Sequence, residues 1–282
     1  MQYAVGARIF LQKKTWKEFF DFVRVVRKEK YDLIIDAQGL IKSALITRMA
    51  KGTRVGLDSS SAREKLAALF YQKKFSVKRE QHAIHRTREL FSRVLNYPTP
   101  NTIPDYGIDR TKLFNSSQEK YLVFLHGTTW VTKHWPEDQW IALAEKAKTA
   151  GINVKLLWGN AEEKTRAEKI VSCAEHGDVM PRLDLISIAK LLAGAAAFVG
   201  VDTGLGHLAA ALNVPGVSLY GPTNPELTGA LGASQIHLTA SIPCAPCLNR
   251  ECKNPAYLPE KKLPCFAVID AERVWNVLHK NF

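Results

Sequence analysis

The segment Val199–Leu212, VGVDTGLGHLAAAL, combines residue types that can hold a phosphate group. An apolar run stops at Asp202, Thr203 and Gly204 and is followed by small residues at a spacing typical of a helix. The first N–H groups of a helix have no partner within the helix, and here they would lie beside the Thr203 hydroxyl and the His207 imidazole. The segment therefore predicts a binding site for a phosphorylated ligand.

The same residues also fit an ordinary turn between a strand and a helix. In that interpretation Asp202 or Thr203 only caps the helix, and Gly204 eases the bend. Asp-Thr-Gly also occurs in aspartic proteases, but this chain has a single copy, and its flanks alternate between strand and helix. We exclude that class, while phosphate binding and simple capping both stay open.

The elements that would position this corner alternate regularly from Tyr121 onward. Strands are predicted at 121–125, 153–157, 197–201 and 216–220, with helices at 136–150, 161–174, 184–193 and 205–212. This alternation is typical of βαβ units in a parallel sheet, which binds ligands at the carboxyl ends of its strands. Polar segments follow all four strands, at His126–Thr129, Trp158–Asn160, Asp202–Gly204 and Gly221–Asn224.

The preceding part of the chain has a similar pattern, with helices predicted at 16–28, 38–50 and 83–95 and a strand at 31–35 ending at Asp36. Gln38 and Lys42 follow that strand and could bind an acidic group of a second substrate, or simply begin a helix. The Pro-rich segment 97–104 is the best linker candidate. We therefore expect two domains, at 1–108 and 109–282.

Composition limits the class of protein. The chain has 282 residues, of which 46% are apolar and 23% charged, as in globular proteins. It has no apolar run of about 18 residues and no secretory signal at its start, so we expect a cytoplasmic protein.

The net charge of +12 favours an anionic partner. Many cations lie between Arg63 and Arg88, on either a solvated helical face or a binding surface. No nucleic-acid-binding signature accompanies them, and no nucleic acid partner is expected.

Four cysteines form a C-x2-C-x4-C-x12-C cluster at Cys244, Cys247, Cys252 and Cys265. The spacing is compatible with a structural zinc ion. Free thiols or local disulfides are the alternative, and structural disulfides are uncommon in the cytoplasm. The last predicted helix, 271–279, has an apolar face that should pack as core, and it could cross back to the first domain.

Seven segments, in order along most of the chain, resemble the lipopolysaccharide heptosyltransferases of glycosyltransferase family 9: DAQGLIKSAL (36–45), SAREKLAALFY (61–71), HAIHRTRELF (82–91), FLHGTTWVTKHWPEDQW (124–140), LLWGNAEE (156–163), LAGAAAFVGVDTGLGHLAAAL (192–212) and LYGPTNP (219–225). The resemblance implies an α/β protein of GT-B type, with two Rossmann-like domains facing a cleft, the N-terminal one incomplete. It also implies inverting transfer of L-glycero-D-manno-heptose from ADP-heptose to Kdo of the lipid A inner core.

That resemblance also implies the roles of individual residues. Thr128, Thr129 and Lys133 would contact the diphosphate; Asp202, Thr203, Gly204 and His207 would close around the phosphates and heptose; Glu163 would bind the ribose; Leu183 would flank the adenine; and Gln38, Lys42 and Arg63 would bind the acceptor. Charge grows on the diphosphate as the sugar leaves, so prealigned donors and a cation, Lys133, can stabilise the transition state without a metal or other cofactor. Without this context Lys133 would be interpreted as a surface lysine beside Trp135.

The resemblance further implies a monomer that binds Kdo-lipid A at the anionic inner face of the cytoplasmic membrane. Relatives begin with a strand and a glycine-containing loop that carries an Asp proposed as the general base, and this sequence has no counterpart of it. The catalytic base is therefore unknown from the sequence, and the N-terminal sheet is expected to have an unpaired edge. An inactive nucleotide-sugar-binding remnant, or a related heptosyltransferase with another acceptor, remain alternatives.

Overall fold

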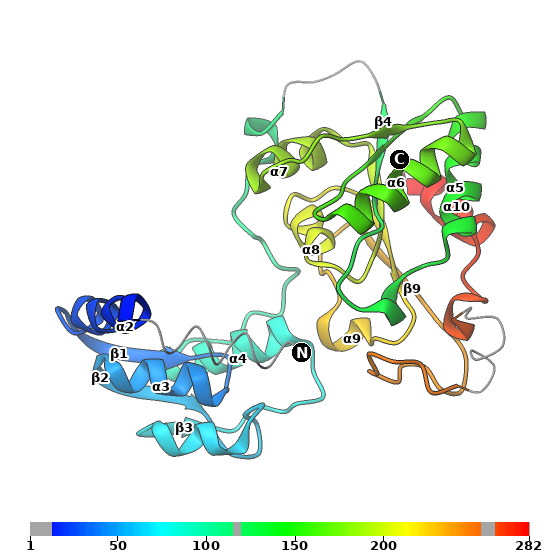
Figure 1. Cartoon of the computed structure of the whole chain (residues 1–282). Helices are drawn as coiled ribbons and strands as arrows, with labels where there is room; N and C mark the ends of the chain where they lie inside the picture. The colour runs from blue at the N-terminus through cyan, green and yellow to red at the C-terminus, as the bar shows by residue number, and fades with distance from the viewer. Residues whose placement is uncertain (1–12, 115–119, 255–262, 282) are drawn as a thin grey trace. The chain divides into compact units, whose positions relative to one another are not determined.

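The computed structural model describes residues 13–114, 120–254 and 263–281. Two compact units divide between Asn101 and Thr102, inside the Pro-rich segment predicted as a linker (Figure 1). Each unit has its own parallel sheet. Within the described residues, no helix is long and apolar enough to cross a membrane.

The second unit is built on a six-stranded parallel sheet with the order β6-β5-β4-β7-β8-β9. Its strands are β4 (Tyr121–Leu125), β5 (Asn153–Leu156), β6 (Asp178–Val179), β7 (Ala197–Val201), β8 (Gly216–Tyr220) and β9 (Gln235–Thr239). This order is that of a doubly wound Rossmann sheet. Successive strands are added on one side of β4 and then, starting with β7, on its other side. The α/β class predicted from the alternating pattern is confirmed.

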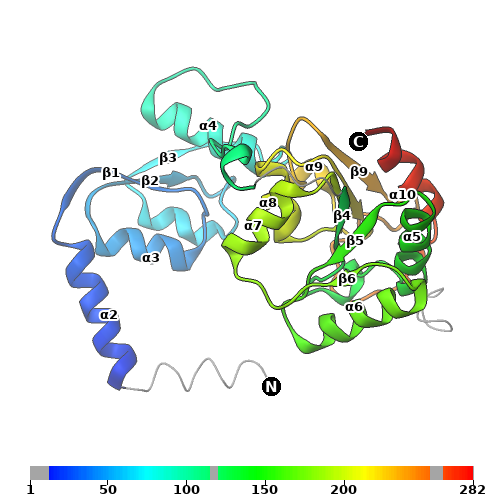
Figure 2. The same cartoon turned by 90° about the horizontal axis from the view of Figure 1, so that it is seen from above.

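Helices cover both faces of this sheet (Figure 2). On one side lie α5 (Glu137–Thr149), α6 (Ala161–Ala174) and α10 (Ala271–Leu278), and on the other α7 (Leu185–Gly194) and α8 (Gly204–Ala211). The short α9 (Pro225–Thr228) follows β8. Strand β4 explains the layering: Leu122 and Phe124 enter one core, whereas Val123 and Leu125 enter the other. Such strands are apolar throughout because both of their faces are buried.

The last helix, α10, packs as core, as its apolar face predicted. Val274 and Leu278 are buried, and the helix contacts α5 and β8 of its own unit. The capping carboxylate of Asp270 accepts a hydrogen bond from Arg273 N at 2.8 Å, which fixes the start of the helix. The crossing of this helix to the first unit stays a prediction.

The first unit has a three-stranded parallel sheet with the order β1-β2-β3. The strands are β1 (Lys30–Asp36), β2 (Lys51–Leu57) and β3 (Lys73–Phe75); the helices are α2 (Lys13–Val26), α3 (Ile41–Met49), the 3₁₀ helix η1 (Lys65–Phe70) and α4 (Ala83–Leu95). Among the described residues β1 pairs with β2 alone. The basic run from Arg63 to Arg88 is not one solvated helical face: it passes through η1, β3 and the start of α4.

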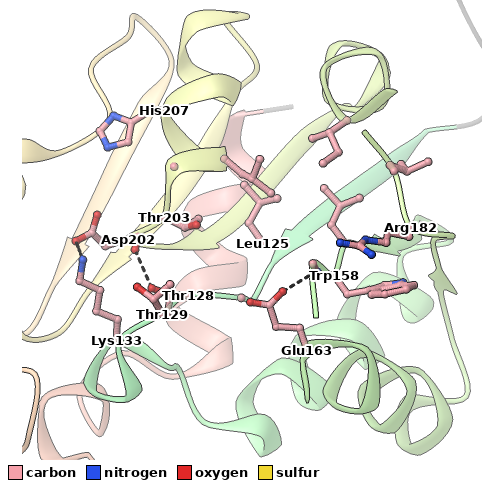
Figure 3. A pocket seen from close by; sticks show the side chains of 17 residues that line it. Leu125, Thr128, Thr129, Lys133, Trp158, Glu163, Arg182, Asp202, Thr203 and His207 are labelled. Carbon is pink, nitrogen blue, oxygen red and sulfur yellow. Dashed lines mark hydrogen bonds and ion pairs between the residues drawn. The ribbon is translucent and has the colours of Figure 1, made fainter. Parts of the chain in front are cut away.

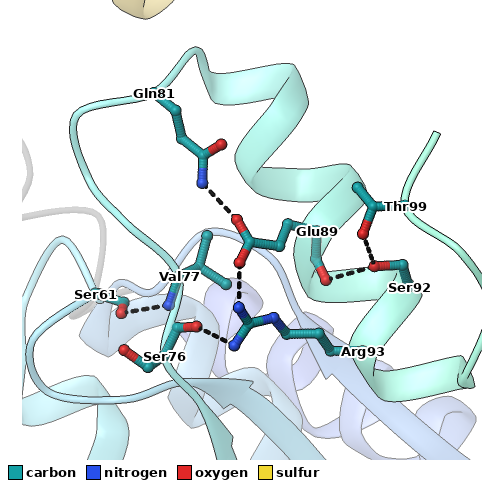
Figure 4. Close-up of polar contacts among 8 residues, drawn as sticks. All are labelled: Ser61, Ser76, Val77, Gln81, Glu89, Ser92, Arg93 and Thr99. Carbon is teal, nitrogen blue, oxygen red and sulfur yellow. Dashed lines mark hydrogen bonds and ion pairs between the residues drawn. The ribbon is translucent and has the colours of Figure 1, made fainter. Parts of the chain in front are cut away.

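Hydrogen bonds fasten the segment around β3 to α4 (Figure 4). Arg93 donates to the Ser76 carbonyl at 2.7 Å and pairs with Glu89 at 2.5 Å. Val77 N donates to the Ser61 hydroxyl at 2.8 Å, which joins the loop after β2 to the loop after β3. The loop that leads to Arg63 is therefore anchored at Ser61 by the segment after β3.

Candidate functional site

A pocket of about 610 Å³ lies at the carboxyl ends of β4, β5 and β7 (Figure 3). Its size falls within the range of small-molecule sites, and its position is the switch point of the sheet. The polar segments predicted after these three strands all contribute to its lining. The fourth predicted segment differs, since Gly221, Thr223 and Asn224 line a separate pocket of about 250 Å³.

The start of α8 is open toward the pocket. Thr203 is the residue before the first turn, but its side chain makes no capping hydrogen bond, and Asp202 pairs with a lysine instead. The simple capping interpretation of this corner is therefore wrong. A Cβ atom added to Gly204 would meet no atom within 4 Å, so the backbone N–H groups there remain approachable by a ligand.

Lys133 supplies a cation in the pocket wall. It lies at the end of the 3₁₀ helix η3 (Val131–Lys133), and its Nζ is 2.7 Å from Asp202 Oδ2, with side chains only 15% and 11% exposed. The same Nζ lies 4.4 Å from the centre of the Trp130 ring. Lys133 is not a surface lysine beside Trp135, because the Trp135 ring is buried in the core and donates to the Ile269 carbonyl.

Glu163 places a carboxylate across the pocket from Lys133 (Figure 3). It lies in the first turn of α6, which is capped by the Asn160 side chain, and accepts a hydrogen bond from Gly159 N at 2.7 Å. A Cβ atom on Gly127 would lie 2.7 Å from the Glu163 carboxyl carbon. Glycine at 127 is therefore what lets this carboxylate approach the end of β4, where it can accept hydrogen bonds from ligand hydroxyl groups.

The remaining predicted donor residues also line the pocket. Thr128 donates weakly to the Asp202 carbonyl at 3.4 Å, and His134 Nε2 lies 2.8 Å from the Thr128 carbonyl, which holds the loop after β4. Burial lowers the pKa of His207, although Asp202 opposes that shift. The imidazole is therefore neutral at pH 7. Thr129 and Leu183 belong to the same lining.

Arg182 lines the pocket but was not predicted as a site residue, and Trp158 was predicted only as part of the segment that follows β5. The Trp158 ring donates to the Met180 carbonyl at 2.6 Å, and Arg182 follows two residues later. A basic residue directly before Leu183 was the available signal for Arg182. Conversely, His126 lies outside the lining: it is 1% exposed beside Trp140, and burial lowers its pKa to about 4.

The predicted acceptor residues gather on the first unit. Glu64 N donates to the Gly39 carbonyl at 3.0 Å, and Ile41 N donates to the Glu64 carboxylate at 2.6 Å. These bonds join the loop carrying Gln38 and Lys42 to the loop carrying Arg63, and all three side chains are exposed. Gly39 has a φ of +63°, and a Cβ there would come within 3.2 Å of Arg63 N. Glycine is required by both the turn and the close approach.

The basic composition favours an anionic partner, and basic side chains gather close to these loops of the first unit. Arg86 donates to the Ser61 carbonyl at 2.8 Å. Burial lowers its pKa, and the nearby guanidinium groups of Arg79 and Arg63 lower it further. Three arginines therefore share this part of the first unit, where they can receive carboxylate or phosphate groups.

Asp36 holds the loop that carries Gln38 and the start of α3. Its buried carboxylate accepts hydrogen bonds from Gln38 N, Gly39 N, the Ser43 hydroxyl and the Tyr71 hydroxyl, at 2.8, 3.2, 2.7 and 2.7 Å. The helix α3 therefore begins only at Ile41, after this anchored loop, and not at Gln38 as its sequence pattern predicted. The four donors occupy the oxygens of this carboxylate before any substrate arrives.

The four clustered cysteines are free thiols. Within the described part of the chain, no group of three or more His, Cys, Asp or Glu side chains could hold a metal ion. Cys265 is buried, and a Cβ on Gly221 would lie 2.9 Å from its sulfur, whereas Cys244 and Cys247 are exposed. Burial raises the pKa of the Cys265 thiol to about 12, and the thiols of Cys252, Cys247 and Cys244 raise it further. The zinc alternative stays a prediction.

A Rossmann-ordered sheet with an open helix start and a lysine at its switch point, together with a second α/β unit, defines a nucleotide-binding protein of the GT-B class. The chain belongs to glycosyltransferase family 9 (heptosyltransferase), whose sequence profile matches residues 19–258.

Curated and solved relatives agree with this assignment. The chain is 50% identical over 274 residues to lipopolysaccharide heptosyltransferase 1 of Pseudomonas aeruginosa, covering 94% of this chain and 76% of that protein. It is similar to the structure of E. coli heptosyltransferase WaaC with ADP, at 37% identity and a TM-score of 0.82, covering 97% of this chain and 80% of that one. It also resembles WaaC with ADP-2-deoxy-2-fluoro heptose, at 36% identity and a TM-score of 0.79, covering 97% and 79% of the two chains. The GT-B type fold implied by the resemblance is confirmed.

Proposed function

We propose that this chain transfers L-glycero-D-manno-heptose from ADP-heptose to Kdo of the lipid A inner core, with inversion at the anomeric carbon, as a type 1 enzyme. The observation that carries the proposal is the mostly buried Lys133 cation beside the uncapped start of α8. A diphosphate leaving group needs this combination of a fixed cation and unpaired N–H donors. The relatives named above support the choice of heptose as the transferred sugar.

In this proposal Lys133, Thr128 and Thr129 bind the diphosphate. The backbone at Thr203 and Gly204 donates to its oxygens, while Asp202 orients Lys133 and, with His207, borders the heptose. Glu163 accepts hydrogen bonds from the ribose hydroxyl groups, and Leu183 packs beside the adenine. Asp202 directly follows β7, and Gly204 and Glu163 lie in the first turns of α8 and α6, so these groups need little reorganisation during the reaction.

Gln38, Lys42 and Arg63 bind the acidic groups of the acceptor in this proposal. No metal or other cofactor takes part, because Lys133 and the helix start supply the charge stabilisation that a divalent cation would give. The chain acts as a monomer at the anionic inner face of the cytoplasmic membrane, where Kdo-lipid A would be presented. Asp36 is not the base that takes the acceptor proton, because its oxygens already accept four hydrogen bonds.

The test is a transfer assay with ADP-heptose and Kdo-lipid A, run beside a calorimetric titration with ADP on the same preparation. We expect ADP to bind and heptose to appear on the acceptor. ADP binding without transfer would refute the proposed activity and favour the nucleotide-sugar-binding remnant. Transfer to another acceptor in preference to Kdo would favour a sister enzyme.

A further inference from the structure

The helix η1 exposes two leucines that a soluble protein would normally bury. Leu66 is 60% exposed and Leu69 is 74% exposed, whereas Ala67 and Ala68 between them are buried. Residues three apart lie on the same face of a 3₁₀ helix, so the two leucines project together. Two adjacent leucines directed outward from an ordered element are a candidate contact with an apolar partner.

The buried alanines between the two leucines determine that the leucine side chains point outward. Ala67 packs with Ala44 of α3 and with Tyr71, whose hydroxyl donates to the Asp36 carboxylate at 2.7 Å. The helices η1 and α3 are in contact, and α3 itself exposes Leu45 at 43%. The outward direction of the leucines therefore follows from a packed and hydrogen-bonded base.

The charges around η1 favour an anionic surface as the partner. Between Arg63 and Phe75 the chain carries four cations, at Arg63, Lys65, Lys73 and Lys74, and all four are exposed. The one acidic residue in this stretch, Glu64, has its carboxylate engaged by Ile41 N at 2.6 Å. Exposed apolar side chains with basic residues close by in the sequence are found in elements that lie in the interface of an anionic bilayer.

The position of η1 relative to the acceptor residues supports the same partner. The helix begins two residues after Arg63, and Glu64 ties it to the loop that carries Gln38 and Lys42. A 3₁₀ helix rises about 2 Å per residue, so Leu69 lies roughly 8 Å along η1 from Lys65, the second residue after Arg63. An acceptor sugar attached to a lipid stays close to the bilayer surface, so its binding residues must lie near the element that contacts the bilayer.

We propose that Leu66 and Leu69 insert into the interface of an anionic lipid bilayer, and that the neighbouring cations bind its head groups. This contact holds the loop that carries Arg63 at the height of a lipid-linked acceptor. The lipid contact deepens the proposed function, but the binding itself does not require heptose transfer.

The first experiment measures binding of the whole chain to vesicles by co-sedimentation. Wild type should bind vesicles of phosphatidylglycerol and phosphatidylethanolamine in preference to phosphatidylcholine vesicles. Leu66→Ser/Leu69→Ser should weaken binding to the anionic vesicles about tenfold, as should Lys73→Glu/Lys74→Glu. The matched control is Leu185→Ser/Ile186→Ser on α7, where two leucine-sized side chains are 64% and 62% exposed; it should bind like wild type.

The second experiment separates membrane contact from catalysis. Leu66→Ser/Leu69→Ser should lose about tenfold in transfer to Kdo-lipid A in vesicles but keep wild-type transfer to a deacylated, water-soluble Kdo acceptor, with unchanged ADP affinity and melting temperature. Wild-type vesicle binding by this variant would overturn the lipid contact, as would an equal loss with both acceptors. Loss of a self-associated species without a change in vesicle binding would identify a contact between copies and also overturn it. If wild type binds anionic vesicles but transfers nothing, the proposed function fails while the lipid contact stands.

Discussion

Replacing Lys133 by methionine tests whether its charge acts on the ligand or only on Asp202. Methionine keeps most of the length and packing of the lysine stem next to Trp130 and removes the ammonium group. Asp202, at 11% exposure, is then left as a mostly buried carboxylate without its cation. Two separate effects follow, one on stability and one on transfer.

The magnitudes of the two effects can be estimated separately. Breaking a fully buried ion pair costs about 3–5 kcal/mol, and the residual exposure of this pair reduces the expected loss of unfolding free energy to about 1–3 kcal/mol. Removing a preorganised group that stabilises charge in the transition state lowers kcat by about 10²–10³, or roughly 3–4 kcal/mol. The double variant Lys133→Met/Asp202→Asn removes the uncompensated carboxylate, so it should recover most of the stability and none of the activity.

The assays are heptose transfer under saturating acceptor, calorimetric ADP affinity and urea denaturation, run on wild type and on both variants. Lys146→Met is the matched control, because Lys146 forms an ion pair with Glu272 away from the pocket. Its activity should equal that of wild type, and its stability should change by less than about 1 kcal/mol. A kcat for Lys133→Met within about threefold of wild type would refute the reasoning, and so would recovery of transfer in the double variant.

Other changes follow from the same geometry. Gly127→Ala places a methyl group 2.7 Å from the Glu163 carboxyl carbon, so ADP affinity measured by calorimetry should fall about tenfold; unchanged affinity would remove Glu163 from the nucleotide site. Gly204→Ala meets no protein atom within 4 Å, so its melting temperature should be normal while the KM for ADP-heptose rises; a wild-type KM would exclude phosphate binding at the start of α8. The pKa of His126 falls from 6.5 to about 4 on folding, so the unfolded chain binds the proton first. The free energy of unfolding should therefore decrease by about 3 kcal/mol as the pH falls from 6.5 to 4. Urea titrations at the two pH values should show this loss reduced in His126→Phe. EDTA should leave the transfer rate unchanged, and a loss restored by Mg²⁺ would contradict metal-independent transfer.

Central strands were predictable from the sequence because both of their faces are buried. The run Tyr121–Leu125 is apolar at every position and corresponds to β4 with the predicted bounds. The strands β2 and β3, with the sequences KGTRVGL and KKF, contain lysine, arginine and glycine and gave no such signal. They form through backbone pairing with strands elsewhere in the chain, and no local pattern encodes that pairing.

The pocket residues also divide into those that the sequence predicted and those that only the fold could place. Those on the turns directly after central strands, such as Thr128 and Asp202, were found because the strand ends themselves were predicted. Arg182 depends on a contact between distant segments: Met180 N donates to the Leu156 carbonyl at 3.0 Å, which extends the edge of the sheet and carries Arg182 to the pocket. Lys133 was located by its motif, but its ion pair with Asp202 joins residues far apart in sequence and required the fold.

Asp36 ends a parallel strand and Asp202 directly follows one, and their polar contacts separate their functions. The four donors around Asp36 come from the loop after β1, from Ser43 of α3 and from Tyr71, so the protein already satisfies this carboxylate, and its substitution should disturb the loop that carries Gln38 first. Among the residues that the structure describes, Asp202 pairs with one cation, Lys133, at 2.7 Å, in the wall of an open pocket. An anionic ligand can share that cation without breaking any backbone contact of Asp202. The aspartate that can respond to an anionic ligand is therefore the one with fewer partners, whereas the aspartate with more partners holds the loop that carries Gln38 and the start of α3.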